Sequence, residues 1–385
     1  MHNGGMTLAA PERLRQDLVS LVHRGMGVRD FSLGAARILA RAVPFDGFCL
    51  VTMDPATMLP TGEVVENGLP ESATPRMTEI EIGGQDVNSF VALRRSGELA
   101  ANLSSVTSGH LDRSMRHREL RRPNGFGDEL RATLVDDSAS WGGLTLLRAS
   151  DSPSFSPADA SLVATLSHHF AEGLRRAMLL NTLTVGRLDD DDDAGLVLLA
   201  PDNTITRADS AARRWLADLG EVEHSQALPA VVRAVASRAR GTDDRDVETM
   251  ARGRVRTQSG RWLLVRGSVL GDGDDAETAV MLEPVRPHEL APLIADAYGL
   301  TERERVVTQL VALGYQTRAI ASRLHISPWT VQDHLKSIFE KVGARTRGEL
   351  VARVFFEHYV PRLMDASPLG SDGWFAPQAT TEEDR

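Results

Sequence analysis

The sequence predicts a multidomain fold in which two α+β domains precede an all-α domain. The chain has 385 residues, which is too many for one hydrophobic core. Strand-like and helical apolar patterns alternate at first, whereas those beyond residue 300 are helical only. An acidic run, Asp189–Asp193, and a proline-bracketed stretch, Glu283–His288, are predicted linkers. The expected segments are, in order, residues 10–183, 194–284, 290–360 and a disordered tail at 365–385.

The first domain is expected to begin with two amphipathic helices and a short buried strand, Phe48–Met53. Two further strands, Leu130–Val135 and Leu144–Leu147, flank a three-residue turn and form a hairpin pattern. A long exit helix then opens at Ser156 and Pro157. The helical faces expected to be buried at the start are Leu14, Leu18, Leu21 and Val22, then Phe31, Ala35, Ile38 and Leu39.

The exit helix carries an apolar stripe at three- and four-residue spacing: Leu162, Leu166, Phe170, Leu174, Ala177 and Met178. The stripe is long enough to serve both its own domain and a partner chain, so we expect a dimer seam there. The alternative is that the stripe only covers the sheet of its own domain.

The stretch Thr61–Leu120 is poorly patterned. Long irregular stretches inside a compact domain are often functional, so we expect this one to form the lid of a cavity over the sheet. Its expected apolar lining is Met77, Phe90, Leu99 and Met115. Cys49 lies mid-strand between Phe48 and Leu50, where core packing is expected rather than a reactive thiol.

The second domain is expected to be smaller and mixed. Its first strand is Gly195–Leu199, followed by a turn and an amphipathic helix around Ala208–Leu219. A hairpin then joins Arg254–Arg256 to Leu263–Arg266, and Thr278–Leu282 closes the sheet.

The segment Leu300–Leu350 predicts a helix-turn-helix unit. A first helix is expected to end at Gly314, because helices commonly end at a residue in the left-handed backbone conformation and glycine adopts it readily. A second helix covers Thr317–Leu324, and a third starts after Ser327, a good N-cap, with Pro328 in its first position. Two helices joined by a three-residue turn are typical of DNA-binding proteins. The expected buried residues are Val306, Val307, Leu310 and Leu313 in the first helix and Val331, Leu335, Ile338 and Val342 in the third.

The residue order of this segment closely resembles the LuxR-type DNA-binding domain. The resemblance implies that the helix after Ser327 lies in the major groove. It also implies a fourth helix, from Arg347 to about Phe356, that often supplies a dimer contact. The matching positions are Leu300, Thr301, Arg303, Glu304, Arg305, Gly314, Thr317, Ile320, Ala321, Leu324, Ile326, Ser327, Thr330, Val331, His334, Ile338, Lys341, Val342, Gly343, Arg347, Glu349 and Leu350.

The front domains carry looser resemblances. The element order of the first domain, with the stretch FGDELRATLVDDSASWGGLTLLR, is similar to a GAF sensor domain. The order of strand, helices and antiparallel strands in the second domain resembles a PAS domain.

Seven residues are predicted to contact DNA: Thr317, Trp329, Thr330, Gln332, Asp333, Lys336 and Lys341. Lys336 can contact a base or a phosphate and Gln332 can pair with adenine, while Asp333 can accept only from cytosine and repels phosphate. Thr317 and Thr330 match family positions near phosphates, to which hydroxyls can donate. The alternative for these positions is an ordinary solvated or capping role.

The charge distribution also favours a DNA-binding role for the helix-turn-helix segment. The whole chain has 43 Lys and Arg against 53 Asp and Glu, a net charge of −10. Between Tyr315 and Arg353, however, seven basic residues face three acidic ones. A basic surface confined to one small module is the pattern of a modular DNA-binding protein, and the acidic remainder should suppress non-specific binding.

The sequence contains no catalytic, metal or cofactor motif: P-loop, GxSxG, HExxH and dinucleotide fingerprints are absent. His168 and His169 are adjacent on a helix and point about 100° apart, poorly placed to share a metal. The chain has no lysine before the DNA-binding segment, which argues against a phosphoacceptor receiver domain and a Schiff base. We therefore expect no enzyme activity and no metal; an unidentified small molecule in the first domain is the candidate ligand.

The combined prediction is a cytoplasmic, homodimeric transcriptional regulator that binds double-stranded DNA. The cytoplasm is expected because no apolar run approaches the ~20 residues of a membrane span, no signal core is present and the chain has one cysteine. The front domains either sense a small molecule or form a ligand-free platform for dimerisation and protein interaction. RNA polymerase is a candidate protein partner, and no membrane partner is expected.

Overall fold

The structure is a computed structural model. It describes residues 10–136, 139–180, 193–220, 228–241, 251–273, 275–285 and 298–351. The chain separates into two compact units, residues 1–285 (unit 1) and 286–385 (unit 2). The predictions for residues 189–192, for residues 286–288, for the helix beyond Val351 and for the tail lie outside the described residues. None of the described helices is both long and apolar enough to cross a lipid bilayer.

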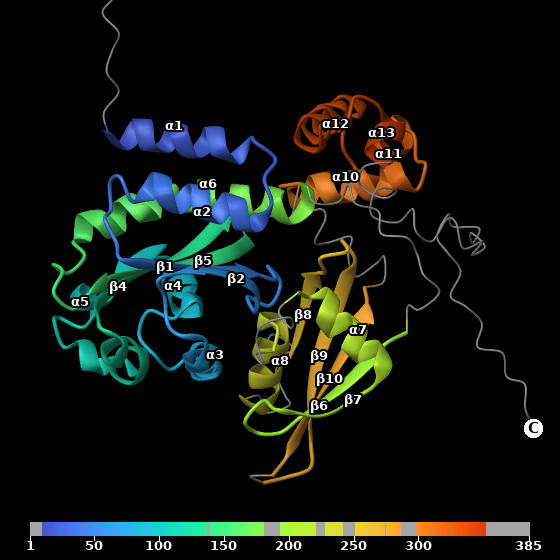
Figure 1. Cartoon of the computed structure of the whole chain (residues 1–385). Helices are drawn as coiled ribbons and strands as arrows, with labels where there is room; N and C mark the ends of the chain where they lie inside the picture. Colours follow the sequence, from blue (N-terminus) through green and yellow to red (C-terminus); the bar gives the residue numbers. More distant parts are fainter. Residues whose placement is uncertain are drawn as a thin grey trace, which may run out of the picture. The chain divides into compact units, whose positions relative to one another are not determined.

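The first sheet of unit 1 has five antiparallel strands in the order β2-β1-β5-β4-β3 (Figure 1). The predicted hairpin is confirmed, since the two long strands β4 and β5 pair along their length. The strands are β1 (Gly47–Met53), β2 (Pro60–Glu66), β3 (Ala100–Asn102), β4 (Phe126–Asp136) and β5 (Ala139–Ala149).

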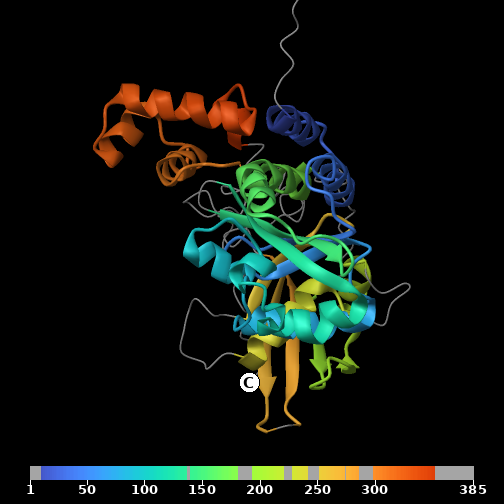
Figure 2. The ribbon, with the colours of Figure 1, turned by 90° about the vertical axis from the view of Figure 1, so that its left-hand side faces the viewer.

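Three helices cover one face of this sheet, as Figures 1 and 2 show: α1 (Ala10–Val22), α2 (Val28–Leu39) and α6 (Pro157–Leu180). Their predicted apolar faces are buried; Leu18 and Phe31 are each 1% exposed. A Cβ on Gly173 would lie 2.0 Å from the ring of Phe31, so only glycine lets α6 approach α2 this closely. The ring of Phe31 packs edge-on against Phe170.

The predicted dimer seam on α6 is already covered within the chain. Leu166, Phe170 and Leu174 are at most 2% exposed because α1, α2 and the first sheet pack on them. Leu162 alone of the stripe is half-buried. The prediction that this stripe also serves a partner is therefore wrong, and the alternative, that it covers its own sheet, is right.

The opposite face of the first sheet carries the stretch 61–120, which is more regular than predicted. α4 shows why a helix forms there: the hydroxyl of Ser89 caps its N-terminus, and Gly97 ends it in the left-handed conformation. In addition to β2 and β3, this stretch contains α3 (Thr74–Gly83), α4 (Phe90–Ser96), α5 (Leu103–Val106), short 3-10 turns and a π-helical turn, His117–Arg121.

The second sheet of unit 1 has the order β7-β6-β10-β9-β8, which repeats the strand order of the first sheet. The helix expected around Ala208–Leu219 starts later than predicted, because a strand, Ile205–Ala208, comes first and the helix begins only after its N-cap, Asp209. The elements are β6 (Gly195–Leu199), β7 (Ile205–Ala208), α7 (Ser210–Asp218), α8 (Ala230–Gly241), β8 (Arg252–Arg256), β9 (Trp262–Leu270) and β10 (Glu277–Pro284).

The two sheets of unit 1 are joined through α8. This helix packs on α3 and β2, and Leu59 and Ile82 of the first part lie in the hydrophobic cluster of the second. Two ion pairs flank the cluster: Arg254 lies 2.8 Å from the carboxylate of Asp54, and the guanidinium of Arg233 lies 2.7 Å from that of Glu63.

Unit 2 contains four helices in its described residues: α10 (Glu302–Ala312), α11 (Thr317–Leu324), α12 (Pro328–Val342) and α13 (Arg347–Val351). The four residues predicted to be buried in α12 are buried. The predicted face of α10 needs a correction: Val311 is buried, while Val306 and Leu313 are half-exposed. The face of α10 is therefore rotated from the one inferred, because α12 and α13 pack against it from two directions.

Candidate functional site

The helix-turn-helix is formed by α11 and α12. α11 ends at His325, which adopts the left-handed conformation with φ of 54°. The hydroxyl of Ser327 then accepts a hydrogen bond of 3.0 Å from the backbone N–H of Thr330 and caps α12. Pro328 in the first turn has no N–H to leave unsatisfied. The short connection therefore fixes the start of α12 relative to α11.

The outer face of α12 is polar and carries one large aromatic. Gln332, Asp333 and Lys336 are exposed between the buried positions that hold the helix in place. Trp329 is 73% exposed, which is unusual for a side chain of its size. A tryptophan left in water beside donors and acceptors is typical of a binding surface.

Three other residues predicted to contact DNA are engaged within unit 2. The hydroxyl of Thr317 accepts from Arg347 (2.8 Å), and that of Thr330 lies 2.9 Å from the hydroxyl of Ser327. Both threonines keep a hydroxyl proton or lone pair for a second partner. Lys341 does not project freely: its Nζ lies 2.7 Å from the carboxylate of Glu304 and donates to a backbone carbonyl. The structure thus gives Lys341 a role in holding α12 to α10.

Glu304 is a buried carboxylate that links three parts of unit 2. It completes a capping box, because its side chain accepts from the backbone N–H of Thr301 at 2.7 Å. Ser337, which the helical pattern places outward, instead donates to Glu304 at 2.6 Å. Burial works to raise the pKa of Glu304, but the hydrogen bonds from Lys341, Ser337 and Thr301 outweigh it and lower that pKa to about 2.

Acidification should therefore destabilise unit 2 through Glu304. Because its pKa is lower in the folded chain than the ordinary 4.5, the stabilisation is present above pH 4.5 and is lost as the pH falls toward 2. Hydrogen exchange of α10 and α12 in the full chain should become faster as this stabilisation is lost. In Glu304→Gln most of this pH dependence should be absent. Glu340→Gln, an exposed change on α12, is the control. An unchanged pH dependence in Glu304→Gln would contradict the assignment.

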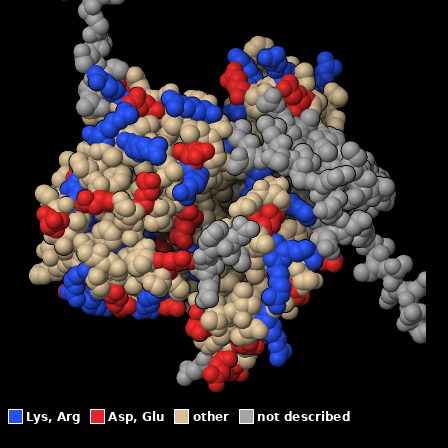
Figure 3. Space-filling view, viewed as in Figure 1, with Lys and Arg blue, Asp and Glu red and all other residues tan. Residues whose placement is uncertain are grey.

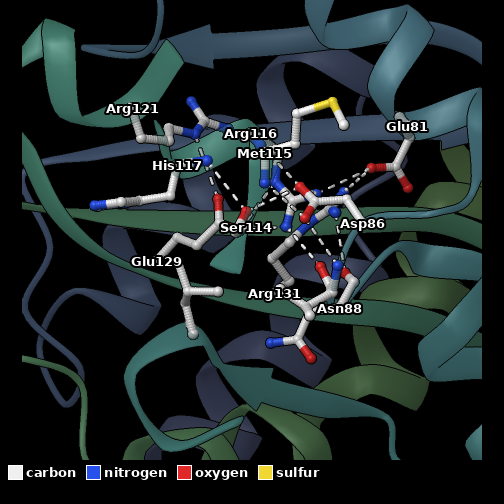
Figure 4. A network of polar contacts seen from close by, with 12 residues as sticks. Glu81, Asp86, Asn88, Ser114, Met115, Arg116, His117, Arg121, Glu129 and Arg131 are labelled. Atoms are coloured by element: carbon white, nitrogen blue, oxygen red, sulfur yellow. Dashed lines mark hydrogen bonds and ion pairs between the residues drawn. The ribbon is translucent and has the colours of Figure 1, made fainter. Parts of the chain in front are cut away.

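Unit 1 buries an ion network that joins arginines to the carboxylates of Glu81, Asp86 and Glu129 (Figure 4). Arg116 is 0% exposed and lies at its centre. Its guanidinium donates to Glu129 at 2.5 and 3.0 Å, to Asp86 at 3.0 Å and to the carbonyl of Val87. The backbone N–H of Arg116 donates to Asp86 as well. Buried charges need such complete pairing, because an unpaired one costs several kcal/mol.

Two further arginines, Arg121 and Arg131, flank this centre. Nε of Arg121 donates to Glu129 at 3.3 Å, and Nη2 of Arg131 lies 2.8 Å from the carboxylate of Glu81. Burial works to raise the pKa of Glu129, yet Arg116, Arg121 and Arg131 lower it to about 2. Burial lowers the pKa of both Arg121 and Arg131. Glu129 is therefore a carboxylate at all ordinary pH values.

A cavity of about 260 Å³ lies against the first sheet, next to the network. The expected lid residues Met77 and Phe90 line it, whereas Leu99 and Met115 do not. Instead, the side chain of Met115 accepts from Arg76, and its backbone N–H donates to Asp86. The full lining is Cys49, Val51, Pro60, Glu63, Val65, Leu69, Glu71, Thr74, Met77, Thr78, Glu81, Ile82, Phe90, Arg121, Arg131, Thr145, Ala230 and Arg233.

Cys49 faces this cavity and is only half-buried, so the expectation of ordinary core packing is wrong. Strand residues alternate between faces, and Phe48 and Leu50 take the face under the helices. Burial raises the pKa of the Cys49 thiol to about 12. The thiol is therefore protonated and is not a nucleophile, as the sequence suggests.

The structure brings His168 and His169 closer than helical geometry alone suggests. The ligand atoms of His168, His169 and Glu172 lie within 4.8 Å of one another. Each outer partner is already engaged, however: His168 lies 3.0 Å from the carboxylate of Asp136, and Glu172 pairs with Arg176 at 2.9 Å. His168 and Glu172 thus have protein partners, whereas Nδ1 of His169 has no hydrogen-bond partner among the described residues, and the cluster carries no metal assignment.

Sequence reasoning missed the ion network, although a signal was present. Glu129 and Arg131 lie at a spacing of two in β4, so both point to the same face. Charged residues on the buried face of a central strand need partners, and such partners are found in the 61–120 stretch. On the surface, by contrast, acidic and basic side chains are interspersed over the face shown in Figure 3.

Comparison with known proteins decides the assignment of unit 2. Residues 299–354 match the profile of the bacterial regulatory proteins of the luxR family. This segment is a LuxR-family DNA-binding domain. The transcriptional regulatory protein DesR of Bacillus subtilis is 33% identical over 96 residues, 23% of this chain and 48% of DesR. The transcriptional regulatory protein UhpA of Escherichia coli is 41% identical over 56 residues, 14% of this chain and 29% of UhpA.

The similarity to these LuxR-family proteins is therefore confined to part of each chain: the match spans about half the length of DesR and less of UhpA. Among solved structures, Escherichia coli SdiA is 13% identical with a TM-score of 0.33, covering 89% of this chain and 95% of SdiA. The GAF domain/HD domain protein from Geobacter sulfurreducens is 18% identical with a TM-score of 0.27, covering 44% of this chain and 98% of that protein. These TM-scores are too low to define the fold of unit 1 by similarity.

Proposed function

We propose that the chain is a sequence-specific transcriptional regulator that reads double-stranded DNA with α12 and senses a small molecule with unit 1. The observation that carries the DNA-binding part is the outer face of α12 in a LuxR-family domain. Trp329, Gln332, Asp333 and Lys336 are exposed there, and α12 is held from behind by its buried face. Such a helix inserts its N-terminal half into the major groove.

The cavity favours the sensing role over the ligand-free platform. A filled, purely structural core would leave no space of about 260 Å³ lined by charged side chains. We further propose a cytoplasmic homodimer that contacts RNA polymerase, with residues 10–183 as the GAF-like sensor, 194–284 as the PAS-like connector and 290–360 as the DNA-binding domain. The dimer contact is expected outside the covered face of α6.

Selection of random double-stranded DNA by the full chain tests this function. A defined sequence should be enriched, and its affinity should fall with salt by roughly 0.9 log units per log salt for each phosphate contact. If no sequence is enriched and binding does not depend on salt, the chain is not a DNA-reading regulator. A small-molecule effect on the affinity would support the sensor, and its absence across an extract of small metabolites would favour the platform.

A further inference from the structure

The floor of the cavity in unit 1 is a row of side chains across three paired strands. Cys49 on β1, Thr145 on β5 and Arg131 on β4 are register partners, so they lie side by side on one face. The ring of Phe90 packs on the guanidinium of Arg131 at 3.8 Å. A Cβ on Gly143 would lie 2.4 Å from that ring, so the glycine makes room for this stacking. The position of Arg131 is thus fixed by its surroundings.

Arg131 has hydrogen-bonding capacity left over. Its Nη1 donates to the carbonyl of Asn88 at 3.0 Å, and its Nη2 faces Glu81 without the angle of a hydrogen bond. Nε of Arg131 has no hydrogen-bond partner among the described residues, although the side chain is 0% exposed. A buried donor without a partner is costly and is rare in native proteins.

Arg121, on the cavity wall, is also incompletely hydrogen-bonded. It is 3% exposed, and its one hydrogen bond to described residues leaves from Nε to Glu129. The terminal nitrogens Nη1 and Nη2 have no partner within the described part of the chain. Glu129 itself is shared, because Arg116 takes its other oxygen at 2.5 Å. The carboxylates of the network therefore pair mainly with Arg116, and the two arginines of the cavity, Arg121 and Arg131, are incompletely paired.

The pKa shifts of Arg116 and Arg121 agree with this uneven pairing. Burial works to lower the pKa of Arg116, but Glu129, Glu81 and Asp86 outweigh it and raise that pKa. For Arg121, burial prevails, and the positive charges of Arg116 and Arg131 add to it. The cavity thus presents two guanidinium groups that one anion would stabilise.

We propose that this cavity binds a small organic monocarboxylate, with its carboxylate between Arg121 and Arg131 and its apolar body against Val51, Met77 and Ile82. A carboxylate offers two acceptors in the geometry that guanidinium groups prefer. A dianion such as a phosphate monoester is disfavoured, because Glu63, Glu71 and Glu81 also line the wall. A volume of about 260 Å³ lies below the 300–1,000 Å³ typical of drug-sized ligands and favours a small molecule.

The cavity also borders the second half of unit 1. Ala230 and Arg233 of α8 complete the cavity wall, and Arg233 is anchored by its ion pair with Glu63 at 2.7 Å. α8 belongs to the hydrophobic cluster of the second sheet. A ligand in this cavity therefore contacts residues that belong to both halves of unit 1. This inference deepens the proposed sensing function and rests on it.

Titration of the full chain with benzoate and hexanoate, followed by calorimetry, tests the proposal. Both carboxylates should bind, and the neutral benzamide and hexanamide should bind about tenfold more weakly or worse. Arg121→Gln should weaken benzoate binding by a similar factor. Met77→Trp should block the cavity without changing its charge. Arg118→Gln is the matched control, since Arg118 lies in the same turn but its side chain is 45% exposed and does not line the cavity.

Hydrogen exchange with benzoate should also fall in α3 and α8, which form the roof. The proposal is overturned if the carboxylates do not bind, if the amides bind equally well, or if Arg118→Gln weakens binding as much as Arg121→Gln. If Arg121→Gln does not fold, the loss of binding in Met77→Trp and the weaker binding of the amides still test whether the cavity binds a carboxylate. DNA binding by the same preparation is measured without benzoate, so a failure of DNA recognition is distinguished from a failure of this site.

Discussion

Replacing Arg116 with methionine should lower the free energy of unfolding of unit 1 by about 3–5 kcal/mol, the usual cost of removing one partner from a buried ion pair. The side chain is fully buried, and the carboxylates of Glu129, Asp86 and Glu81 lie 2.5, 3.0 and 4.0 Å from it. Methionine fills similar space but leaves these carboxylates without their main cation. Glu129 would then be a buried charge held only by Arg121 and Arg131.

Denaturant unfolding of the full chain, followed by tryptophan fluorescence to which the buried Trp141 contributes, would measure this loss. Arg118→Met is the control, because the ion pair of Arg118 with Glu119 is exposed at 3.6 Å and should contribute about 0–1 kcal/mol. Equal effects of the two substitutions would mean that the network does not hold unit 1 together.

The helix-turn-helix could be predicted from the sequence because its information is local. The cap at Ser327, the left-handed positions and the 3.6-residue periodicity all lie within the elements they define. The bounds of α11 and the buried positions of α12 are as predicted. The differences in this domain concern the buried face of α10 and the side chains of Ser337 and Lys341, which hydrogen-bond to Glu304 of another helix.

Unit 1 was harder to predict because its decisive contacts join distant segments. Asp86, Arg116 and Glu129 come from a loop, a turn and a strand, and no local pattern links them. The stripe on α6 shows the same limit: periodicity identifies a buried face but not whether α1, α2 or a second chain buries it. The packing of α8 on α3 likewise depends on two apolar faces more than a hundred residues apart.

On DNA, Gln332→Ala and Lys336→Ala should weaken binding in different ways. Both side chains project from α12 without a role in the packing of unit 2. Gln332 can form two hydrogen bonds with an adenine, so its loss should cost about 1–3 kcal/mol at one base pair and relax preference there. Lys336 neutralises a phosphate or contacts a guanine. Its loss should weaken binding to every sequence and reduce the salt slope by roughly 0.9.

Fluorescence anisotropy of the full chain with the selected DNA, at several salt concentrations and with each base substituted in turn, separates the two effects. Gln309→Ala is the matched control, because this glutamine is exposed on α10 and should leave both quantities unchanged. A uniform loss across all sequences in Gln332→Ala would place that side chain at the phosphates instead. If neither α12 substitution changes the binding while the control does, α10 rather than α12 enters the groove.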